Sequence, residues 1–508
     1  MANLTTSSLI ARNATLNLLG EGWVFLVLLV AMPKLIRFLG EASFGLFSLA
    51  WVIIGYLTVL DIGVSRAATK FISGHLANRE FASVHQIVST AIVANLGLGT
   101  VGGLTVALAS PFLVHSVFKV GTGLEQQAKL AFYVAALAVP VLLLQGVFRG
   151  VLSSFQRFGW ITAVNTIATT LQWGLACFLA WRGHSLALVV LSTVLVRTLA
   201  TAAYGLVLKT VMPKGRLLRT PDFDHLSKLL RFGSWVTVSQ VVGPLLVYLD
   251  RVLIASFNSL GAVALYTVPY EVMTRLRIIP SSLVTSLYPA FSERTHQDSR
   301  TQLETLYRQS IRYLLPLLLP GILILVILGS DLLEIWMGAA FAAQTTSALK
   351  ILAFGVLANG MAFIPFNILQ AVGRPDLTGK FHILELPAYL VLCLALIPHF
   401  GINGAAWAST FRFTLDAALL FWAVRKYCRF SLKRMWNRNL AGMLGLTTSL
   451  AAGLFVIRIS LPTPWLRVAA ASLATLIYFA VAWIAVVDSK EKLGLGSALK
   501  FSGNASES

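Results

Sequence analysis

The feature that most constrains this chain is a series of long apolar segments separated by short polar loops. About fourteen such segments can be delimited, at 12–33, 43–62, 84–110, 127–149, 160–181, 186–209, 232–256, 262–291, 312–330, 348–371, 379–398, 404–424, 438–458 and 465–487. Each is long enough to cross a bilayer hydrocarbon core of about 30 Å. Because lipid offers no partner for backbone N–H and C=O groups, such segments fold as helices. The runs are continuous rather than alternating, which argues against a membrane β-barrel. We therefore predict an all-α polytopic membrane protein.

Lysine and arginine alternate between the two sides of these segments. The loops on one side, with the termini, carry 27 of the 40 basic residues, and the opposite loops carry 8. Cytoplasmic loops retain Lys and Arg, so the bias predicts that both termini are cytoplasmic. The net charge of +20 lies mainly in these loops. Membrane topology and anionic lipid headgroups therefore explain it better than nucleic-acid binding.

Signals for enzymatic chemistry are weak. Cys177, Cys393 and Cys428 are scattered and form neither a disulfide framework nor a metal cluster, and the eight histidines show no ligand spacing. The stretch from Gly373 to Lys380 has one residue too many for a phosphate-binding loop. No loop is long enough to fold as a catalytic domain. We expect no catalytic residues, no metal and no cofactor, and energy from an ion gradient, the membrane potential or the substrate gradient. The N-terminus lacks a signal-peptide pattern, so we expect the first segment to be retained as an anchor.

Short matches between distant segments indicate an internal repeat. GLFSLAW at 45–51 aligns with ALYTVPY at 264–270, and the same offset places 59–73 on 278–292. Further on, 155–165 aligns with 372–382. We predict two six-helix lobes, an additional helix pair and a cytoplasmic tail, at 1–210, 226–428, 437–490 and 491–508. Six is an even number, so the lobes are parallel repeats, and substrate sites in such transporters lie between repeats near the midplane.

Several stretches resemble a known family. PLLVYLDRVLIASFNSLGAVALYTVPYEVMTRLRIIPSSLVTSLYPAFS at 244–292 is similar to the seventh and eighth helices of bacterial polysaccharide flippases. DIGVSRAATKFIS, LQAVGRPDLTGKFHILELPAYL and GINGAAWASTFRFTLDAALLFW fit the same family. The resemblance is to the O-antigen-type, lipid-linked oligosaccharide branch of the multidrug/oligosaccharidyl-lipid/polysaccharide (MOP) exporters. It implies about fourteen transmembrane helices, a V-shaped pair of lobes like that of MATE transporters, and translocation of an undecaprenyl-pyrophosphate-linked glycan across the bacterial inner membrane.

Charged residues inside the apolar segments are the candidate site residues, because a central charge costs about 2.5–3.5 kcal/mol on insertion scales. Glu271 and Arg275 share a helix face, as do Arg412 and Asp416, so each pair is either an intrahelical ion pair or part of a cavity. Arg277 lies about 200° around the helix from Arg275 and needs another explanation. Glu21 is the deep carboxylate of the N-terminal lobe. Asp250, Arg251 and Glu385 lie nearer segment ends, where their side chains could reach an interface.

Other candidates lie at segment ends. Arg66 and Arg149 either mark ordinary topology or first contact an entering pyrophosphate, and Asp61 beside Gly63 either caps a helix or binds a cation, capping being favoured. Because Pro269, Pro280 and Pro289 fall in one segment with three buried charges, we expect the eighth helix to move or face substrate. The pyrophosphate candidates are Arg275, Arg277, Arg66, Arg149 and Arg412, and the ion-coupling or charge-pair candidates are Glu21, Glu271 and Asp416.

The leading functional interpretation is a flippase for undecaprenyl-pyrophosphate-linked glycan that works by alternating access. It would contact membrane lipids and the polymerase and chain-length machinery of its pathway. An ion-coupled drug or cation antiporter of the same superfamily is the alternative, and it should show a compact acidic site in the N-terminal lobe. A membrane glycosyltransferase or polymerase is a third alternative, disfavoured because the outward loops are short.

Overall fold

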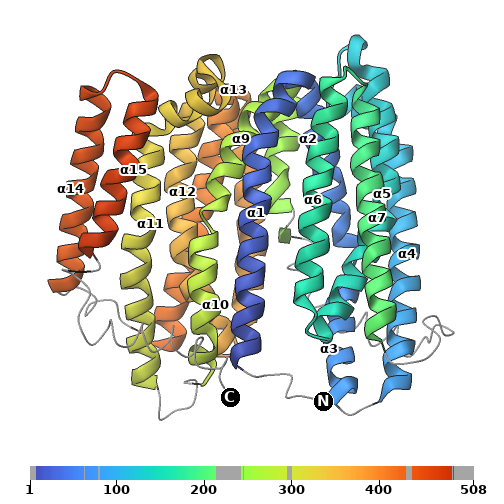
Figure 1. Cartoon of the computed structure of the whole chain (residues 1–508), viewed down its shortest axis with the longest axis horizontal. Coiled ribbons are helices and arrows are strands. Elements are labelled where there is room, and N and C mark those ends of the chain that lie inside the picture. Colours follow the sequence, from blue (N-terminus) through green and yellow to red (C-terminus); the bar gives the residue numbers. More distant parts are fainter. Residues whose placement is uncertain are drawn as a thin grey trace. The chain divides into compact units, whose positions relative to one another are not determined.

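The computed structural model describes residues 7–61, 63–77, 80–212, 242–243, 245–293, 300–430, 438–482 and 484. Helices make up most of these residues, and no strand occurs among them (Figure 1). The predicted all-α fold is confirmed.

The chain forms two compact units, Met1–Ala264 and Leu265–Ser508. Helices of the first unit are α1 (Ser7–Leu39), α2 (Glu41–Leu57), η1 (Thr58–Asp61), α3 (Val64–Ala77), α4 (Phe81–Phe112), η2 (Leu113–Val117), α5 (Thr122–Ser154), α6 (Phe158–Trp181) and α7 (Leu186–Val211). The helix α9 (Leu260–Arg275) crosses the boundary. The second unit continues with α10 (Ile278–Glu293), α11 (Arg300–Met337), α12 (Ala339–Ala371), α13 (Pro375–Ala423), η4 (Val424–Cys428), α14 (Arg438–Ser460) and α15 (Pro464–Val481).

Within the described part of the chain, ten helical stretches are long and apolar enough to cross a membrane. The predicted segments differ from these ten in four places. Segments 379–398 and 404–424 both lie in α13, and 43–62 comprises the 17-residue α2 followed by η1. Segment 262–291 is divided between α9 and α10, and most of the first half of 232–256 lies outside the described residues. The polytopic membrane architecture is therefore confirmed, whereas the lobe boundaries stay a prediction.

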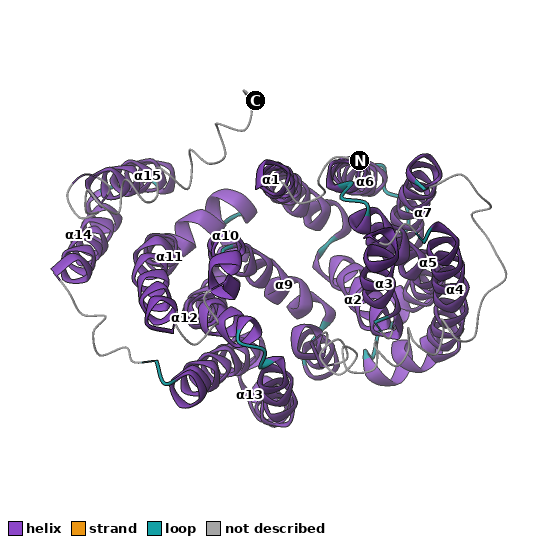
Figure 2. Ribbon diagram, turned by 90° about the horizontal axis from the view of Figure 1, so that it is seen from below, coloured by secondary structure: helices purple, strands orange, loops and turns teal. Residues whose placement is uncertain are grey.

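Small residues allow the helices of the first unit to approach closely. A side chain at Gly103 of α4 would place its Cβ 2.7 Å from the carbonyl oxygen of Ala136 on α5, so only glycine fits there. Figure 2 shows these two helices side by side. Close packing over small residues is a general means of association between membrane helices, because lipid tails are as apolar as the helix surface.

Asp61 caps α3. Its Oδ1 accepts hydrogen bonds from the backbone N–H of Ser65 at 3.1 Å and from the Ser65 hydroxyl at 2.8 Å. Asn95 on α4 donates to the same oxygen from Nδ2 at 2.6 Å. Gly63, at φ 69°, provides the left-handed turn between η1 and α3. The capping interpretation of Asp61 is confirmed.

The C-terminal helices α14 and α15 pack against each other and against α11 (Figure 1). Arg467 of α15 donates from Nη1 to Oδ1 of Asp331 at 2.7 Å, and the hydroxyl of Tyr478 donates to the carbonyl oxygen of Pro316 at 3.0 Å. Arg458 of α14 donates to the carbonyl oxygen of Ile327. Three polar contacts, made at different positions along α11, therefore attach α14 and α15 to that helix.

Candidate functional site

The candidate site begins with a fold in α13. Gly401 has φ 56° and ψ −132°, which interrupts this 49-residue helix and separates it into two parts. Positive φ is strained for residues with a Cβ, so glycine is the residue suited to this position. The chain that precedes Gly401 and the chain that follows it can then pair as antiparallel helices.

Each part of α13 places three polar residues on one face. His382, Glu385 and Tyr389 are spaced by three and four residues before the break, and Ser409, Arg412 and Asp416 repeat that spacing after it. Residues three, four and seven apart share a helix face. Two matching polar faces therefore meet in antiparallel register.

The contacts between the two faces follow this register. Tyr389 and Ser409 share a hydrogen bond of 3.2 Å between their hydroxyls, and the Arg412 guanidinium lies 5.2 Å from the centre of the Tyr389 ring. At the other end, one ligand atom of each of His382, Glu385 and Asp416 lies within 4.8 Å of the others. These side chains form a polar array that is buried except for the half-buried His382, and we call it the α13 cluster (His382, Glu385, Tyr389, Ser409, Arg412 and Asp416).

Neighbouring helices hold the cluster in place. Thr410 donates from Oγ1 to the carbonyl oxygen of Ile351 on α12 at 2.8 Å. Gly355 of the same helix allows this close approach, because a Cβ at that position would lie 2.9 Å from the Cα of Thr410. Tyr266 of α9 hydrogen-bonds to the Ser409 hydroxyl at 3.0 Å. These contacts fix the second half of α13 against two helices, so Arg412 and Asp416 have a defined position.

Burial makes the charges of the α13 cluster significant. Arg412 is 8% exposed, Asp416 9% and Glu385 1%. Arg412 also lies over the Phe413 ring at 4.3 Å, a cation–π contact that partly replaces water. Buried charges persist only where partners offset the loss of hydration.

Arg277 approaches the same cluster from a break in another segment. Leu276 and Arg277 lie between α9 and α10, near the middle of the predicted segment 262–291 and three residues before Pro280. Pro280 is the third residue of α10, in the first turn, where a missing N–H leaves no intrahelical hydrogen bond unmade, so α10 can begin directly after this interruption. The guanidinium of Arg277 lies 5.4 Å from the centre of the Phe363 ring on α12 and interacts electrostatically with Arg412 and Asp416.

The other pair on this segment behaves as an intrahelical ion pair. Arg275 Nη2 lies 3.7 Å from Oε2 of Glu271, and the two side chains are 30% and 35% exposed. The predicted Arg412–Asp416 relationship differs, because Asp416 faces Glu385 and His382 while Arg412 stacks on two rings. Glu271 and Arg275 thus form an ion pair within one helix, whereas Arg412 and Asp416 belong to the α13 cluster.

The remaining predicted residues lie in the first unit. Glu21 of α1, Arg66 of α3 and Arg149 of α5 are all exposed on its surface. Arg149 interacts electrostatically with Arg197, whose Nε donates to Oε1 of Gln172 at 2.7 Å. The structure therefore brings Arg277, Arg412 and Asp416 together, whereas Glu21, Arg66 and Arg149 lie outside that group.

Three expectations about segment ends are wrong. Asp250 and Arg251 are 0% and 2% exposed, and Arg251 donates from Nη1 to the carbonyl oxygen of Val247 at 2.8 Å. Glu385 is equally buried within the α13 cluster. The position of a residue along a segment indicates its depth in the membrane, but it does not show which helices surround the side chain. These three side chains are packed against protein.

Sequence reasoning also missed His382 and Glu385 as a group with Asp416. Ligand spacing along the chain does not reveal this group, because it joins His382 and Glu385 to a residue more than thirty positions away. The repeated three-and-four spacing of polar residues on both sides of Gly401 is the signal that could have revealed it.

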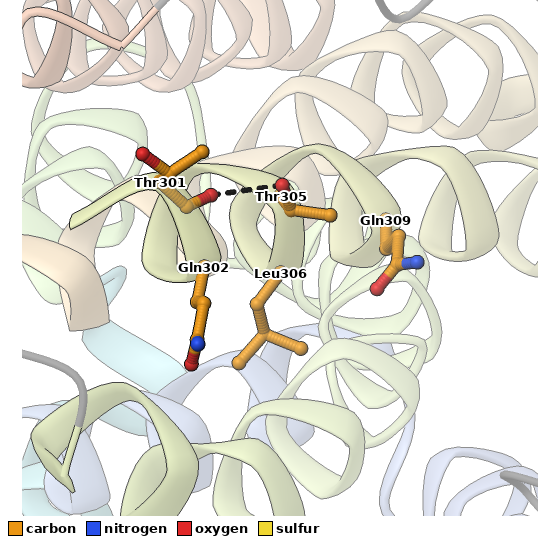
Figure 3. A pocket seen from close by; sticks show the side chains of 5 residues that line it. All are labelled: Thr301, Gln302, Thr305, Leu306 and Gln309. Atoms are coloured by element: carbon orange, nitrogen blue, oxygen red, sulfur yellow. Dashed lines mark hydrogen bonds between the residues drawn. The ribbon is translucent and has the colours of Figure 1, made fainter. Parts of the chain in front are cut away.

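A shallow pocket of about 280 Å³ lies elsewhere in the second unit, along the first turns of α11. Figure 3 shows the side chains that line it, Thr301, Gln302, Thr305, Leu306 and Gln309, projecting from one helix. Hydroxyl and amide groups of this kind can hydrogen-bond to sugars, but none of these five residues can neutralise a phosphate.

Comparison with known proteins agrees with this architecture. A protein of Shigella flexneri named "Putative O-antigen transporter" is 26% identical over 82% of this chain and 98% of its own length. The "Probable low-salt glycan biosynthesis flippase Agl15" of Haloferax volcanii is 23% identical over 79% of this chain and 80% of its length.

Solved structures show the same fold at low identity. The lipid II flippase MurJ, in an inward closed conformation, has a TM-score of 0.71 at 12% identity and covers 92% of this chain and 100% of its own. An inward-facing MATE multidrug transporter of the MOP superfamily has a TM-score of 0.66 at 15% identity, over 80% of this chain and 96% of its own. The family described as polysaccharide biosynthesis protein matches residues 10–295, more than half of the sequence. The chain belongs to the polysaccharide biosynthesis protein family.

Proposed function

We propose that this protein is a flippase that moves undecaprenyl-pyrophosphate-linked glycans from the cytoplasmic to the outer face of the bacterial inner membrane. Its family and the names of its relatives support transport of a lipid-linked glycan. The bias of Lys and Arg supports an orientation with both termini in the cytoplasm. On this proposal the protein moves the glycan lipid without changing it chemically and works beside the polymerase and chain-length machinery.

The observation that carries the proposal is Arg277, held at a helix break in the middle of an apolar segment. Discontinuous helices form substrate sites in many transporters, because the break frees polar groups inside the membrane. The guanidinium offers a planar set of donors that suits a phosphate oxygen pair. Pyrophosphate is common to every undecaprenyl-pyrophosphate donor, so one contact there would serve many glycans.

Other arginines have secondary roles in this proposal. Arg412 supplies positive charge behind Arg277, since the two interact electrostatically. Arg275 is already paired with Glu271, and the exposed Arg66 and Arg149 suit first contact with a lipid headgroup. Alternating access would use the two proposed six-helix lobes, 1–210 and 226–428.

Reconstitution of the purified protein in liposomes tests this function. A lipid-linked oligosaccharide with an undecaprenyl-pyrophosphate anchor is incorporated, and a lectin that cannot cross the bilayer reports its exposure on the opposite leaflet. We expect exposure to be fast with the wild type and slow with Arg277→Ala. Equal rates in protein-containing and protein-free liposomes would contradict the flippase assignment.

A cation or drug antiporter is the second candidate, because His382, Glu385 and Asp416 form a compact group of possible cation ligands. The group lies in the second unit rather than in the N-terminal lobe, where this alternative was expected to have it. Uptake of a fluorescent organic cation by the same liposomes, driven by a pH or sodium gradient, would favour the antiporter.

A further inference from the structure

The fold at Gly401 also brings the two ends of α13 together. Phe381, in the second turn of α13, packs against Trp422 near its last residue, with the ring centres 6.4 Å apart. Trp422 in turn packs edge-on against Tyr427 of η4, with the ring centres 6.3 Å apart. These residues lie far apart in the sequence, so their contact depends on the antiparallel pairing of the two parts of α13.

Cations from both ends share these rings. The guanidinium of Arg374, directly before α13, lies 4.6 Å from the centre of the Tyr427 ring. The ammonium of Lys426 lies 5.6 Å from the same ring centre and 4.6 Å from the centre of the Trp422 ring. Cation–π contacts of this kind hold positive charge over an aromatic face. Two like charges are therefore held beside one tyrosine, where they repel each other.

Carboxylates compensate for only part of this charge. Asp376 accepts hydrogen bonds from Arg374 at 3.0 and 3.3 Å and from Lys380 at 3.2 Å. It is the one acidic residue in 372–381 and 421–430, whereas the same two stretches contain the basic residues Arg374, Lys380, Arg425, Lys426 and Arg429. In the described part of the chain, no carboxylate pairs with Lys426. This end of α13 therefore has an excess of positive charge.

Exposed apolar and aromatic side chains adjoin these cations. Ile383 and Leu384, on the turn that follows Lys380, are 50% and 60% exposed, and Trp422 and Tyr427 are 47% and 42% exposed. On a membrane-spanning helix such as α13, exposed isoleucine and leucine suit contact with acyl chains. Tryptophan and tyrosine are typical of the headgroup level of the bilayer. The cations stacked on these two rings thus lie at a depth that suits lipid phosphates.

We propose that a basic–aromatic surface (Arg374, Lys380, Trp422, Lys426 and Tyr427) binds the phosphate of an anionic phospholipid headgroup. The phosphate accepts hydrogen bonds from Arg374 and Lys426 and relieves the repulsion between them. On the orientation proposed above, this end of α13 meets the cytoplasmic leaflet, whose anionic lipids attract basic segments. The general excess of Lys and Arg in cytoplasmic loops explains the number of cations here, but it does not explain their packing on shared rings. The inference does not depend on what the protein transports.

A bound headgroup would join the beginning of α13 to η4. Arg374 precedes the first part of α13 and Lys426 follows the second part, so a phosphate that contacts both favours the antiparallel pairing on which the α13 cluster depends. Anionic phospholipid should therefore raise the thermal stability of the wild type in detergent more than that of Lys426→Gln. Equal stabilisation of the two proteins would contradict this link.

Native mass spectrometry of the full chain in detergent tests the binding site. Dioleoyl phosphatidylglycerol is the anionic probe. Dioleoyl phosphatidylcholine is the reference, because it carries the same phosphate next to a choline cation. We expect the wild type to bind phosphatidylglycerol more tightly than phosphatidylcholine. Lys426→Gln should weaken phosphatidylglycerol binding about fivefold, the effect of one basic residue near an anionic lipid surface, and Lys426→Arg should retain it.

Two comparisons separate a built site from general attraction between charges. Lys209→Gln removes the same charge from the last turn of α7, on the same side of the membrane by the proposed topology, and should leave the affinity unchanged. Tyr427→Leu keeps the net charge but removes the shared ring, and should weaken phosphatidylglycerol binding several-fold. Both Lys426 and Tyr427 are exposed, so their variants should elute as folded protein.

The outcomes decide the proposal in each direction. Equal losses of affinity in Lys209→Gln and Lys426→Gln would overturn the site, and so would equal affinities of the wild type for the two lipids. Inorganic pyrophosphate distinguishes a lipid from a free anion. At a concentration equal to that of the lipid it should not displace phosphatidylglycerol, and full displacement would overturn the assignment to a lipid.

Discussion

Arg467 Nη1 lies 2.7 Å from Asp331 Oδ1, and this ion pair joins α15 to α11 where Asp331 is 3% exposed. Arg467→Ala would leave the charge of Asp331 buried without the guanidinium of this ion pair. We expect the free energy of unfolding to fall by about 3 kcal/mol. Thermal unfolding in detergent measures the loss. Adding Asp331→Asn should restore most of it, and a double variant as unstable as the single one would contradict the charge-based explanation.

The cap of α3 gives a second prediction. Asp61→Ala removes the acceptor for the Ser65 backbone N–H and for Asn95, and should lower stability by about 1–2 kcal/mol. Asp61→Asn keeps one acceptor oxygen and should lose less. The same unfolding measurement ranks the two variants, and an order with Asn below Ala would argue against a capping role.

Arg277 gives a third prediction, on transport. Arg277→Ala should reduce glycan translocation to near background while insertion and expression are retained. Arg277→Lys should keep part of the rate, because the charge survives while the planar fork of donors is lost. Leaflet exposure in liposomes gives both rates. A wild-type rate in Arg277→Ala would remove this residue from the substrate site.

Glu271 and Arg275 give a fourth prediction, since their 3.7 Å ion pair allows a charge-neutral replacement. Arg275→Ala alone leaves Glu271 without its partner guanidinium and should impair the protein. The double variant Glu271→Gln with Arg275→Gln should transport at nearly the wild-type rate if the pair is structural. Loss of transport in a well-folded double variant would instead assign the pair to the substrate path.

Topology gives the fifth prediction. A reporter active only in the cytoplasm, fused after Ser508, should be active, and the same reporter inserted at Gly338, between α11 and α12, should be inactive. Both positions on one side of the membrane would contradict the orientation derived from Lys and Arg.

The sequence predicts the helical architecture well because the length of an apolar segment is a property of the linear chain. It predicts the α13 cluster poorly because His382 and Asp416 meet only through the register of two helices folded at Gly401. The break at Leu276 and Arg277 is a similar case. Prolines at 269 and 280 indicate a disturbance, but the exact interruption depends on how α9 and α10 pack. Arg277, Arg412 and Asp416 could be identified as buried charges, whereas their grouping required the structure.

The attachment of α14 and α15 to α11 has an evolutionary consequence. Among the described residues, the close packing of α14 and α15 on other helices is with α11, so this pair could be gained, lost or exchanged without rebuilding the rest of the second unit.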